Sequence, residues 1–182
     1  DEMPKGLALG AVLKRENAMD AVVCANNMTW EKLPKGAVIG TGSLRRKMQI
    51  LALRNDLDVV PIRGNIITRL QKLEQGFDAV VLAVAGLVRT QQQQKISHIF
   101  TLQEMIPAAC QGILALKIRE NDLFLKNAMK KINNENAFVC QKAERAFLKQ
   151  IGADCHAPAG ALAKIENGKL YMKAMFYTNK IL

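Results

Sequence analysis

The feature that most constrains the fold of this 182-residue chain is an alternation of short apolar runs with longer helical segments. Residues 37–40, 57–63 and 77–85 have the composition of buried strands, and residues 44–55 and 66–74 have the apolar spacing of helices. A strand–helix–strand–helix–strand order predicts a parallel sheet with right-handed crossovers. We therefore predict an α/β fold in which Ser43 caps the first of these helices.

The remainder of the chain is expected to be of mixed α and β structure. Residues 113–118 have the pattern of a strand, and residues 123–150 have that of a helical region whose Ala137 and Cys140 face a core. Residues 170–177 alternate as a strand does, and the preceding Asn-Gly pair at residues 167–168 predicts a hairpin turn.

Arginines follow each of the three predicted strands. Arg45 and Arg46 come after the first, Arg63 and Arg69 lie at the second, and Arg89 follows the third. Ligands of open α/β sheets bind at the carboxyl ends of the strands. Arg45 and Arg46 also occupy the first helical turn, where the helix dipole disfavours a cation by roughly 0.3–1 kcal/mol. Because a guanidinium grips carboxylate or phosphate bidentately, we predict a multiply charged anionic ligand rather than five separate surface arginines.

The amino-acid composition limits the classes of partner that this chain is expected to bind. The net charge is +10, from 26 Lys and Arg against 16 Asp and Glu, but aromatic residues make up only 5% of the chain. Few side chains are therefore available to stack on bases, and we expect no nucleic-acid partner. The sequence has no apolar run of about 20 residues, so we expect no membrane span. Four irregularly spaced cysteines and two distant histidines predict reduced thiols, a cytoplasmic protein and no metal site.

Cys155 lies in a segment, residues 151–161, that is rich in glycine and contains a proline. Turn chemistry of this kind keeps a thiol accessible, and accessibility is what a covalent attachment needs. Cys24, Cys110 and Cys140 have apolar or helix-forming neighbours, which favours a structural role. From the residues alone, a chemical role and a structural role for Cys155 both remain open.

Several separate motifs resemble one family in order and spacing. Residues 40–46, 62–70, 82–87, 111–112 and 152–163 are similar to segments of porphobilinogen deaminase (hydroxymethylbilane synthase) over nearly the whole chain. The resemblance implies a transferase of tetrapyrrole and heme biosynthesis. Such an enzyme condenses four porphobilinogen units, with loss of ammonia, into hydroxymethylbilane on a covalently attached dipyrromethane primer.

The resemblance also implies a role for individual residues. The cofactor-binding residues would be Cys155, which carries dipyrromethane through a thioether, together with Ser43, Arg45 and Arg46. The substrate-binding residues would be Arg63, Arg69 and Arg89. The arginines would neutralise the acetate and propionate groups of the pyrroles. Asp154 departs from the family pattern, in which glycine is commoner, and like-charge repulsion from its carboxylate would raise the pKa of the adjacent thiol. For His156 a local polar role is preferred to a dyad with Cys155.

The resemblance further implies a fragment of a three-domain enzyme. We expect residues 1–13 to be a remnant of domain 1, residues 14–108 to form domain 2, residues 109–132 to return to domain 1, and residues 133–182 to be part of domain 3. Domain 2 would be a periplasmic-binding-protein-like parallel-sheet domain, and domain 3 a small α+β domain. The family's catalytic aspartate would lie upstream of Asp1, so no catalytic residue is assigned.

One alternative of a different class remains. A non-catalytic anion-binding module of the periplasmic-receptor type accounts for the sheet and the arginines, but it gives no reason for the loop that contains Cys155. In either case we expect a small-molecule ligand and a monomer. Activity of a chain of this length on its own is left open.

Overall fold

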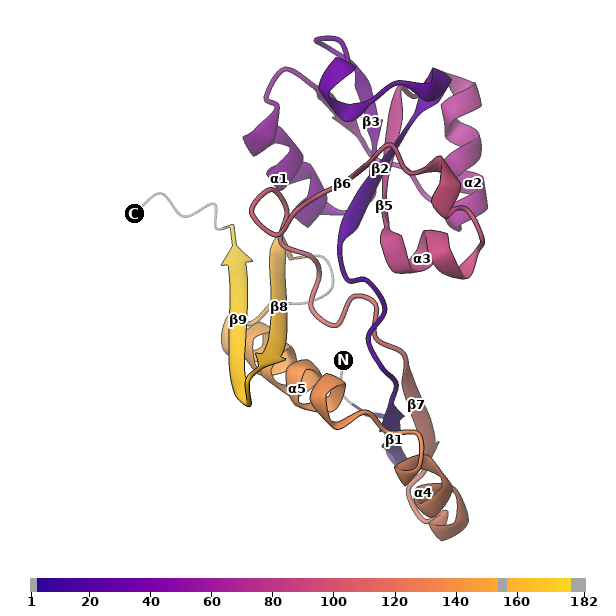
Figure 1. Ribbon diagram of the computed structural model, residues 1–182, viewed down its shortest axis with the longest axis vertical. Coiled ribbons are helices and arrows are strands. Elements are labelled where there is room, and N and C mark those ends of the chain that lie inside the picture. The colour runs from indigo at the N-terminus through magenta and orange to yellow at the C-terminus, as the bar shows by residue number, and fades with distance from the viewer. Residues whose placement is uncertain (1–2, 154–156, 178–182) are drawn as a thin grey trace.

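The computed structural model describes residues 3–153 and 157–177, and it has two parts (Figure 1). The sheet lobe, residues 20–99, contains a five-stranded sheet with helices on both faces. The lower part contains two two-stranded sheets and two helices. The segments before and after the sheet lobe run side by side between the two parts (Figure 1).

The five-stranded sheet is mixed rather than wholly parallel. Its strands are β2 (Asp20–Cys24), β3 (Val38–Gly40), β4 (Asp58–Val60), β5 (Ala79–Ala83) and β6 (His98–Ile99). In the order β4-β3-β5-β2-β6, β3 is parallel to both β4 and β5, which confirms the predicted parallel unit. Strand β2 is antiparallel to β5 and β6, and neither β2 nor β6 was predicted from the sequence.

Helices cover both faces of this sheet (Figure 1). They are α1 (Leu44–Leu53) on one face, and α2 (Ile66–Leu70) and α3 (Val84–Arg89) on the other. Alternate residues of β5 join different cores, because Val81 packs with Ile50 of α1 and Val80 packs with Leu70 and Leu87. Burial on both faces explains why this strand is apolar without interruption. The strand ends at Ala83, earlier than predicted, because the next residue begins α3.

The predicted helices are confirmed with shorter bounds. The segment predicted as a helix over residues 66–74 consists of α2 followed by a 3-10 turn, and Gly76 ends it with a φ of 91°. The other 3-10 turns of the described chain are η1 (Ala25–Asn27), η2 (Trp30–Lys32) and η4 (Gln93–Lys95), with η3 at Gln71–Gln75. Residues 123–150 form two helices, α4 (Leu123–Lys130) and α5 (Glu135–Gln150). The break falls where the side chain of Asn134 caps α5 by accepting from the Ala137 amide at 2.9 Å.

The lower part is built from two antiparallel pairs. Strand β1 (Leu7–Val12) pairs with β7 (Ala115–Arg119), and α4 lies against β1 (Figure 1). Strands β8 (Ala159–Glu166) and β9 (Lys169–Phe176) form the predicted hairpin, and α5 packs on β8. Its turn residues, Asn167 and Gly168, both have positive φ, at 50° and 73°, as this type of turn requires. The predicted division into domains at residues 13, 108 and 132 stays a prediction.

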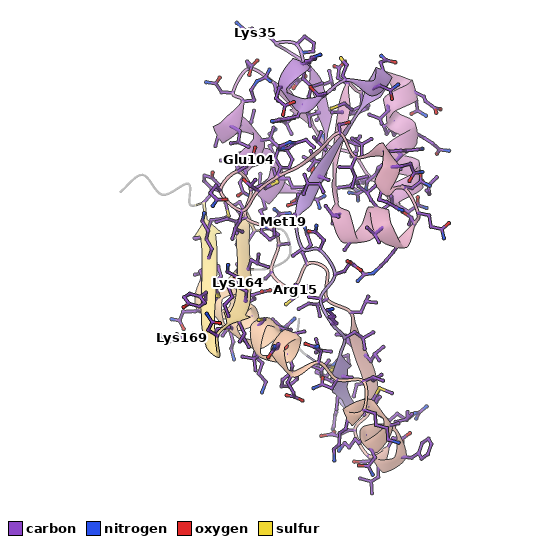
Figure 2. All side chains as sticks on the ribbon, in the orientation of Figure 1. Arg15, Met19, Lys35, Glu104, Lys164 and Lys169 are labelled. Atoms are coloured by element: carbon purple, nitrogen blue, oxygen red, sulfur yellow. The ribbon has the colours of Figure 1, made fainter. Side chains whose placement is uncertain are left out.

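A buried carboxylate joins four segments of the chain at the junction of the two parts. Glu144 of α5 is fully buried and forms a bidentate pair with Arg15, at 2.7 and 2.8 Å. It also accepts from the amides of Cys110 and Ala163, each at 2.6 Å. Arg15 lies in the segment that leads into the sheet lobe (Figure 2). The contact therefore fixes α5 and β8 to both connecting segments.

Gly160 marks a second close approach between the two parts. A Cβ atom placed there would lie 2.7 Å from the carbonyl oxygen of Pro107 and 2.8 Å from that of Ile106. The amide of the next residue, Ala161, donates to Pro107 at 3.0 Å. Backbone atoms on both sides make this contact, so no flexible side chain can move away to admit a larger residue.

Gly160→Ala is therefore expected to destabilise the fold by about 1–3 kcal/mol, the usual cost of overpacking a well-packed site. The matched control is Gly168→Asn, because that position has a positive φ that Asn tolerates and open space around its Cβ. Urea unfolding of the two variants measures the difference. Equal midpoints for Gly160→Ala and the unsubstituted chain would show that the two parts do not pack as described.

Candidate functional site

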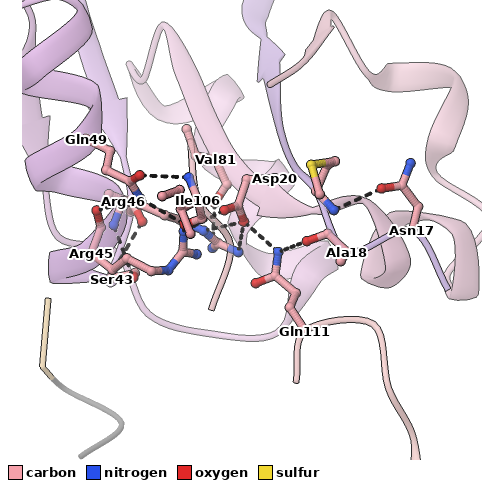
Figure 3. Close-up of polar contacts among 12 residues, drawn as sticks. Asn17, Ala18, Asp20, Ser43, Arg45, Arg46, Gln49, Val81, Ile106 and Gln111 are labelled. Atoms are coloured by element: carbon pink, nitrogen blue, oxygen red, sulfur yellow. Dashed lines mark hydrogen bonds and ion pairs between the residues drawn. The ribbon is translucent and has the colours of Figure 1, made fainter. Parts of the chain in front are cut away.

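Arg45 and Arg46 of α1 meet a carboxylate of β2 in the interior (Figure 3). One oxygen of Asp20 accepts from Arg45 Nη1 at 2.7 Å, and the other accepts from Arg46 Nε at 2.9 Å. Asp20 is fully buried, and the two arginines are 4% and 8% exposed. Two buried guanidinium groups thus share one carboxylate, which leaves an excess of positive charge at this edge of the sheet.

The electrostatic balance favours the charged form of Asp20. Burial alone would raise its pKa, but the charges of Arg46 and Arg45 and the hydrogen bonds from Arg45 and Gln111 outweigh burial and lower it. Burial lowers the pKa of Arg45, and the pairing with Asp20 opposes that shift. An arginine remains protonated at neutral pH in any case.

Neutral groups complete the positioning of the two arginines. Arg45 Nη1 also donates to the Ile106 carbonyl at 2.8 Å, and Arg46 Nη1 donates to the Val81 carbonyl at 3.0 Å. Gln49 pairs with both backbone groups of Ile106, accepting from the amide at 2.7 Å and donating to the carbonyl at 3.0 Å (Figure 3). Gln111 Nε2 donates to Asp20 at 3.0 Å. The guanidinium planes are therefore held by the sheet and by the connecting segment.

A cavity of about 1280 Å³ opens beside this cluster, between α1 of the sheet lobe and α5 of the lower part. Its polar lining includes Ser43, Arg45, Arg69, Lys142, Arg145 and Lys149. Small residues, among them six alanines, form much of the remaining wall. Among the described residues that line it there is no Asp or Glu, so the cavity is a cationic space suited to an anion.

The structure brings some of the predicted residues together and leaves others apart. Ser43 lines the cavity and caps α1, its hydroxyl accepting from the Arg46 amide at 3.4 Å. Arg69 also lines it, with Nε donating to the Gly64 carbonyl at 2.7 Å. Burial and the nearby charge of Arg46 lower the pKa of Arg69. Within residues 3–153 and 157–177, Arg69 forms no ion pair with a carboxylate.

Two of the predicted substrate-binding arginines do not line this cavity. Arg63 is exposed after β4, and Arg89 is exposed at the end of α3. Arg89 donates to the Gly112 carbonyl at 3.0 Å, so it contacts the segment that returns from the sheet lobe. Their expected roles therefore stay predictions without support from the lining of the cavity.

Cys155, Asp154 and His156 lie outside the described residues, as does Asp1. The described residues on either side of that segment, Ala153 and Ala157, both line the large cavity. They also line a smaller cavity of about 370 Å³, which has Leu44, Met48 and Tyr177 in its wall. Both ends of the segment that contains Cys155 therefore border the cationic space.

The other three cysteines have structural environments. Cys24 and Cys140 are buried, as predicted, and burial raises the pKa of each thiol. Cys110 is half-buried and has an unusual positive φ of 64°. Burial, reinforced by the charge of Glu144, raises the pKa of Cys110 to about 11. Thiols of this kind are almost entirely protonated near neutral pH and are poor nucleophiles.

Sequence reasoning missed the acidic partner and one wall of the site. Asp20 lies on a strand that was not predicted, so nothing placed it beside the arginines. Lys142, Arg145 and Lys149 recur at i, i+3 and i+7, a spacing that puts them on one helical face. That signal was present in the sequence, but residues 123–150 were interpreted only in terms of core packing.

No group of three or more His, Cys, Asp or Glu side chains in residues 3–153 and 157–177 is arranged to hold a metal ion. In the same ranges, no helix has the length and apolar character that a membrane span requires.

Asp20→Asn is expected to lower the free energy of unfolding by about 3–5 kcal/mol at neutral pH, because it leaves two buried guanidinium groups without a counterion. The folded-state pKa of Asp20 lies below its ordinary 3.8. Its carboxylate therefore contributes fully above about that pH, and the contribution is lost as the pH falls through the folded-state pKa. Urea unfolding at about pH 7 and about pH 3 should show the gap between wild type and variant narrowing in acid. A gap of constant size would contradict the assigned pairing.

Family models match most of the chain. The model described as porphobilinogen deaminase, dipyromethane cofactor binding domain, matches residues 1–127, and the model described as porphobilinogen deaminase, C-terminal domain, matches residues 138–182. Among solved structures, the methionine binding protein MetQ aligns with 88% of this chain and 70% of its own, at 11% identity and a TM-score of 0.46.

Curated relatives are similar along the same length. The porphobilinogen deaminase of Alkaliphilus metalliredigens is 45% identical over 175 residues, which are 96% of this chain and 55% of the relative. That of Clostridium botulinum (strain Langeland) is 41% identical over 183 residues, which are 100% of this chain and 63% of the relative. The chain thus spans less than two thirds of the length of these relatives. With two family models in register and these identities, the chain belongs to the porphobilinogen deaminase family.

Proposed function

We propose that the complete protein is a hydroxymethylbilane synthase, which condenses four porphobilinogen units, with loss of ammonia, on a dipyrromethane attached to Cys155. The observation that carries this proposal is the cationic cavity bordered by both ends of the segment that contains Cys155. Its wall suits a ligand with many carboxylates, and it is larger than the roughly 300–1,000 Å³ of ordinary small-molecule pockets.

The residues of the cavity fit a polycarboxylate cofactor. Five cationic side chains line it, and Asp20 offsets only part of the charge of the Arg45 and Arg46 cluster. Guanidinium donors held by backbone carbonyls and by a buried carboxylate are preorganised, so a ligand carboxylate meets them at little reorganisation cost. Dipyrromethane, when attached, supplies a fixed acceptor for the condensation.

Individual residues then take separate tasks. Cys155 forms the tether, while Ser43, Arg45 and Arg46 hold cofactor carboxylates. Arg69 pairs with a carboxylate of the incoming substrate, which is porphobilinogen. Arg63 and Arg89 contact the substrate or the growing chain where it extends outside the cavity. No proton-transfer step is assigned to a residue of this chain.

The remaining parts of the proposal concern the setting of the enzyme. We propose a cytoplasmic monomer that acts on a small molecule, without a nucleic-acid or membrane partner. The chain is basic overall, and five of its cationic side chains line one cavity whose described lining has no Asp or Glu, which suits a small anionic ligand.

Cys155→Ser tests the tether directly. The intact mass of the complete wild-type protein is expected to exceed the polypeptide mass by one dipyrromethane, and this increment should disappear in Cys155→Ser. Cys140→Ser serves as the control, because that thiol is buried among the core residues of α5 and its loss should leave the increment in place. An active protein with the bare polypeptide mass would overturn the proposal, and reversible binding of a small carboxylate without an adduct would support the anion-binding module instead.

Arg69→Gln tests the substrate contact. Removing one charge-assisted hydrogen bond in the cavity is expected to lower kcat/KM for porphobilinogen by about tenfold or more. Arg119→Gln removes the same charge from β7, outside the cavity, and should change kcat/KM by less than about twofold. Equal losses in both variants would indicate a general effect of net charge and would refute the assigned contact.

A further inference from the structure

A row of cations on α5 forms a wall of the cavity that the proposed function leaves without a task. Lys142, Arg145 and Lys149 all line the cavity, whereas Ala137, Cys140 and Glu144 of the same helix face the protein interior. The helix therefore has one face that packs and one face that is basic. About 10 Å of helix axis separates the first cation from the last, at 1.5 Å per residue.

Helix stability does not account for this arrangement. Like charges three and four residues apart repel each other on a helix surface. Lys149 lies in the last turn, where the helix dipole favours a cation, but Lys142 and Arg145 lie in the middle of the helix. The ammonium of Lys142 is held 4.5 Å from the ring centre of Phe138, a contact that orients the side chain without occupying its hydrogen-bond donors.

The position of the row relative to α1 indicates what it binds. Arg45 and Arg69 enter the cavity from the sheet lobe, and the α5 cations enter it from the lower part. The described lining contains no Asp or Glu, and Asp20, which pairs with Arg45, is fully buried and is not part of that lining. A ligand with carboxylates at both ends, or along its length, would therefore contact both walls at once.

We propose that Lys142 and Lys149 form a second carboxylate-binding surface for a linear polycarboxylate held between α5 and α1. Taking this ligand to be the growing pyrrole chain rests on the proposed function. The binding surface itself does not, because any extended polycarboxylate would satisfy it. The cations on α5 would bind those ligand carboxylates that Arg45 and Arg69 do not contact.

The test uses 1,2,3,4-butanetetracarboxylate, an open-chain polycarboxylate, as the probe, titrated calorimetrically into the complete protein in a Cys155→Ser background, which excludes an adduct at that thiol. Lys142→Gln with Lys149→Gln is expected to weaken binding by about tenfold, as two charge pairs of modest strength predict. The matched control is Lys126→Gln with Lys130→Gln, which removes the same number of charges from exposed positions on α4. The control pair should change the dissociation constant by less than about twofold.

Restoring charge provides a second check. Lys142→Arg with Lys149→Arg should bind the probe within about twofold of the background protein, which separates loss of charge from a change in the helix. Equal weakening by the α5 and α4 pairs, or no weakening by the α5 pair, would overturn the proposal. The Cys155 adduct is measured separately by intact mass. A missing adduct would therefore refute the proposed function without refuting the α5 binding surface, and unweakened probe binding would refute the surface without refuting the adduct.

Discussion

The contact between Asp20 and the two arginines of α1 organises the candidate site. A single buried carboxylate holds Arg45 and Arg46, and it does so from β2, an interior strand of the sheet. Each arginine is also fixed by a backbone carbonyl, Ile106 or Val81. Placing cations at the start of a helix is unfavourable on its own. The carboxylate offsets this cost in part, and the remaining positive charge is what an anionic ligand would neutralise.

A second buried carboxylate has a similar role in the lower part. Glu144 fixes α5 through Arg15 and two backbone amides, and this orientation turns the basic face of α5 toward α1. The two acidic residues are thus structural counterions, while the cations that line the cavity face the space between the two parts. A site for a multiply charged anion depends on this separation, because carboxylates in the lining would compete with the ligand.

The sequence allowed the parallel β3, β4 and β5 unit to be predicted because local signals agree there. Apolar runs alternate with amphipathic helices, Ser43 and Gly76 mark helix ends, and the arginines recur after the strands. Strand β2 was missed because its antiparallel partner, β5, lies far along the chain. The five residues of β2 carry no local signal for that pairing. The pairing with Asp20 could not be predicted for the same reason. The basic face of α5 was readable from its spacing, but its role depends on packing against β8, which only the three-dimensional arrangement shows.

The central claim is that the cationic space between α1 and α5 holds a polycarboxylate tethered at Cys155. A crystal structure of the complete protein carrying its covalent group tests this most directly. We expect electron density continuous with the Cys155 sulfur, with carboxylates within hydrogen-bond distance of Arg45 and of the Ser43 end of α1. Density continuous with that sulfur but directed away from this cavity, with Arg45 contacting only Asp20 and Ile106, would contradict it.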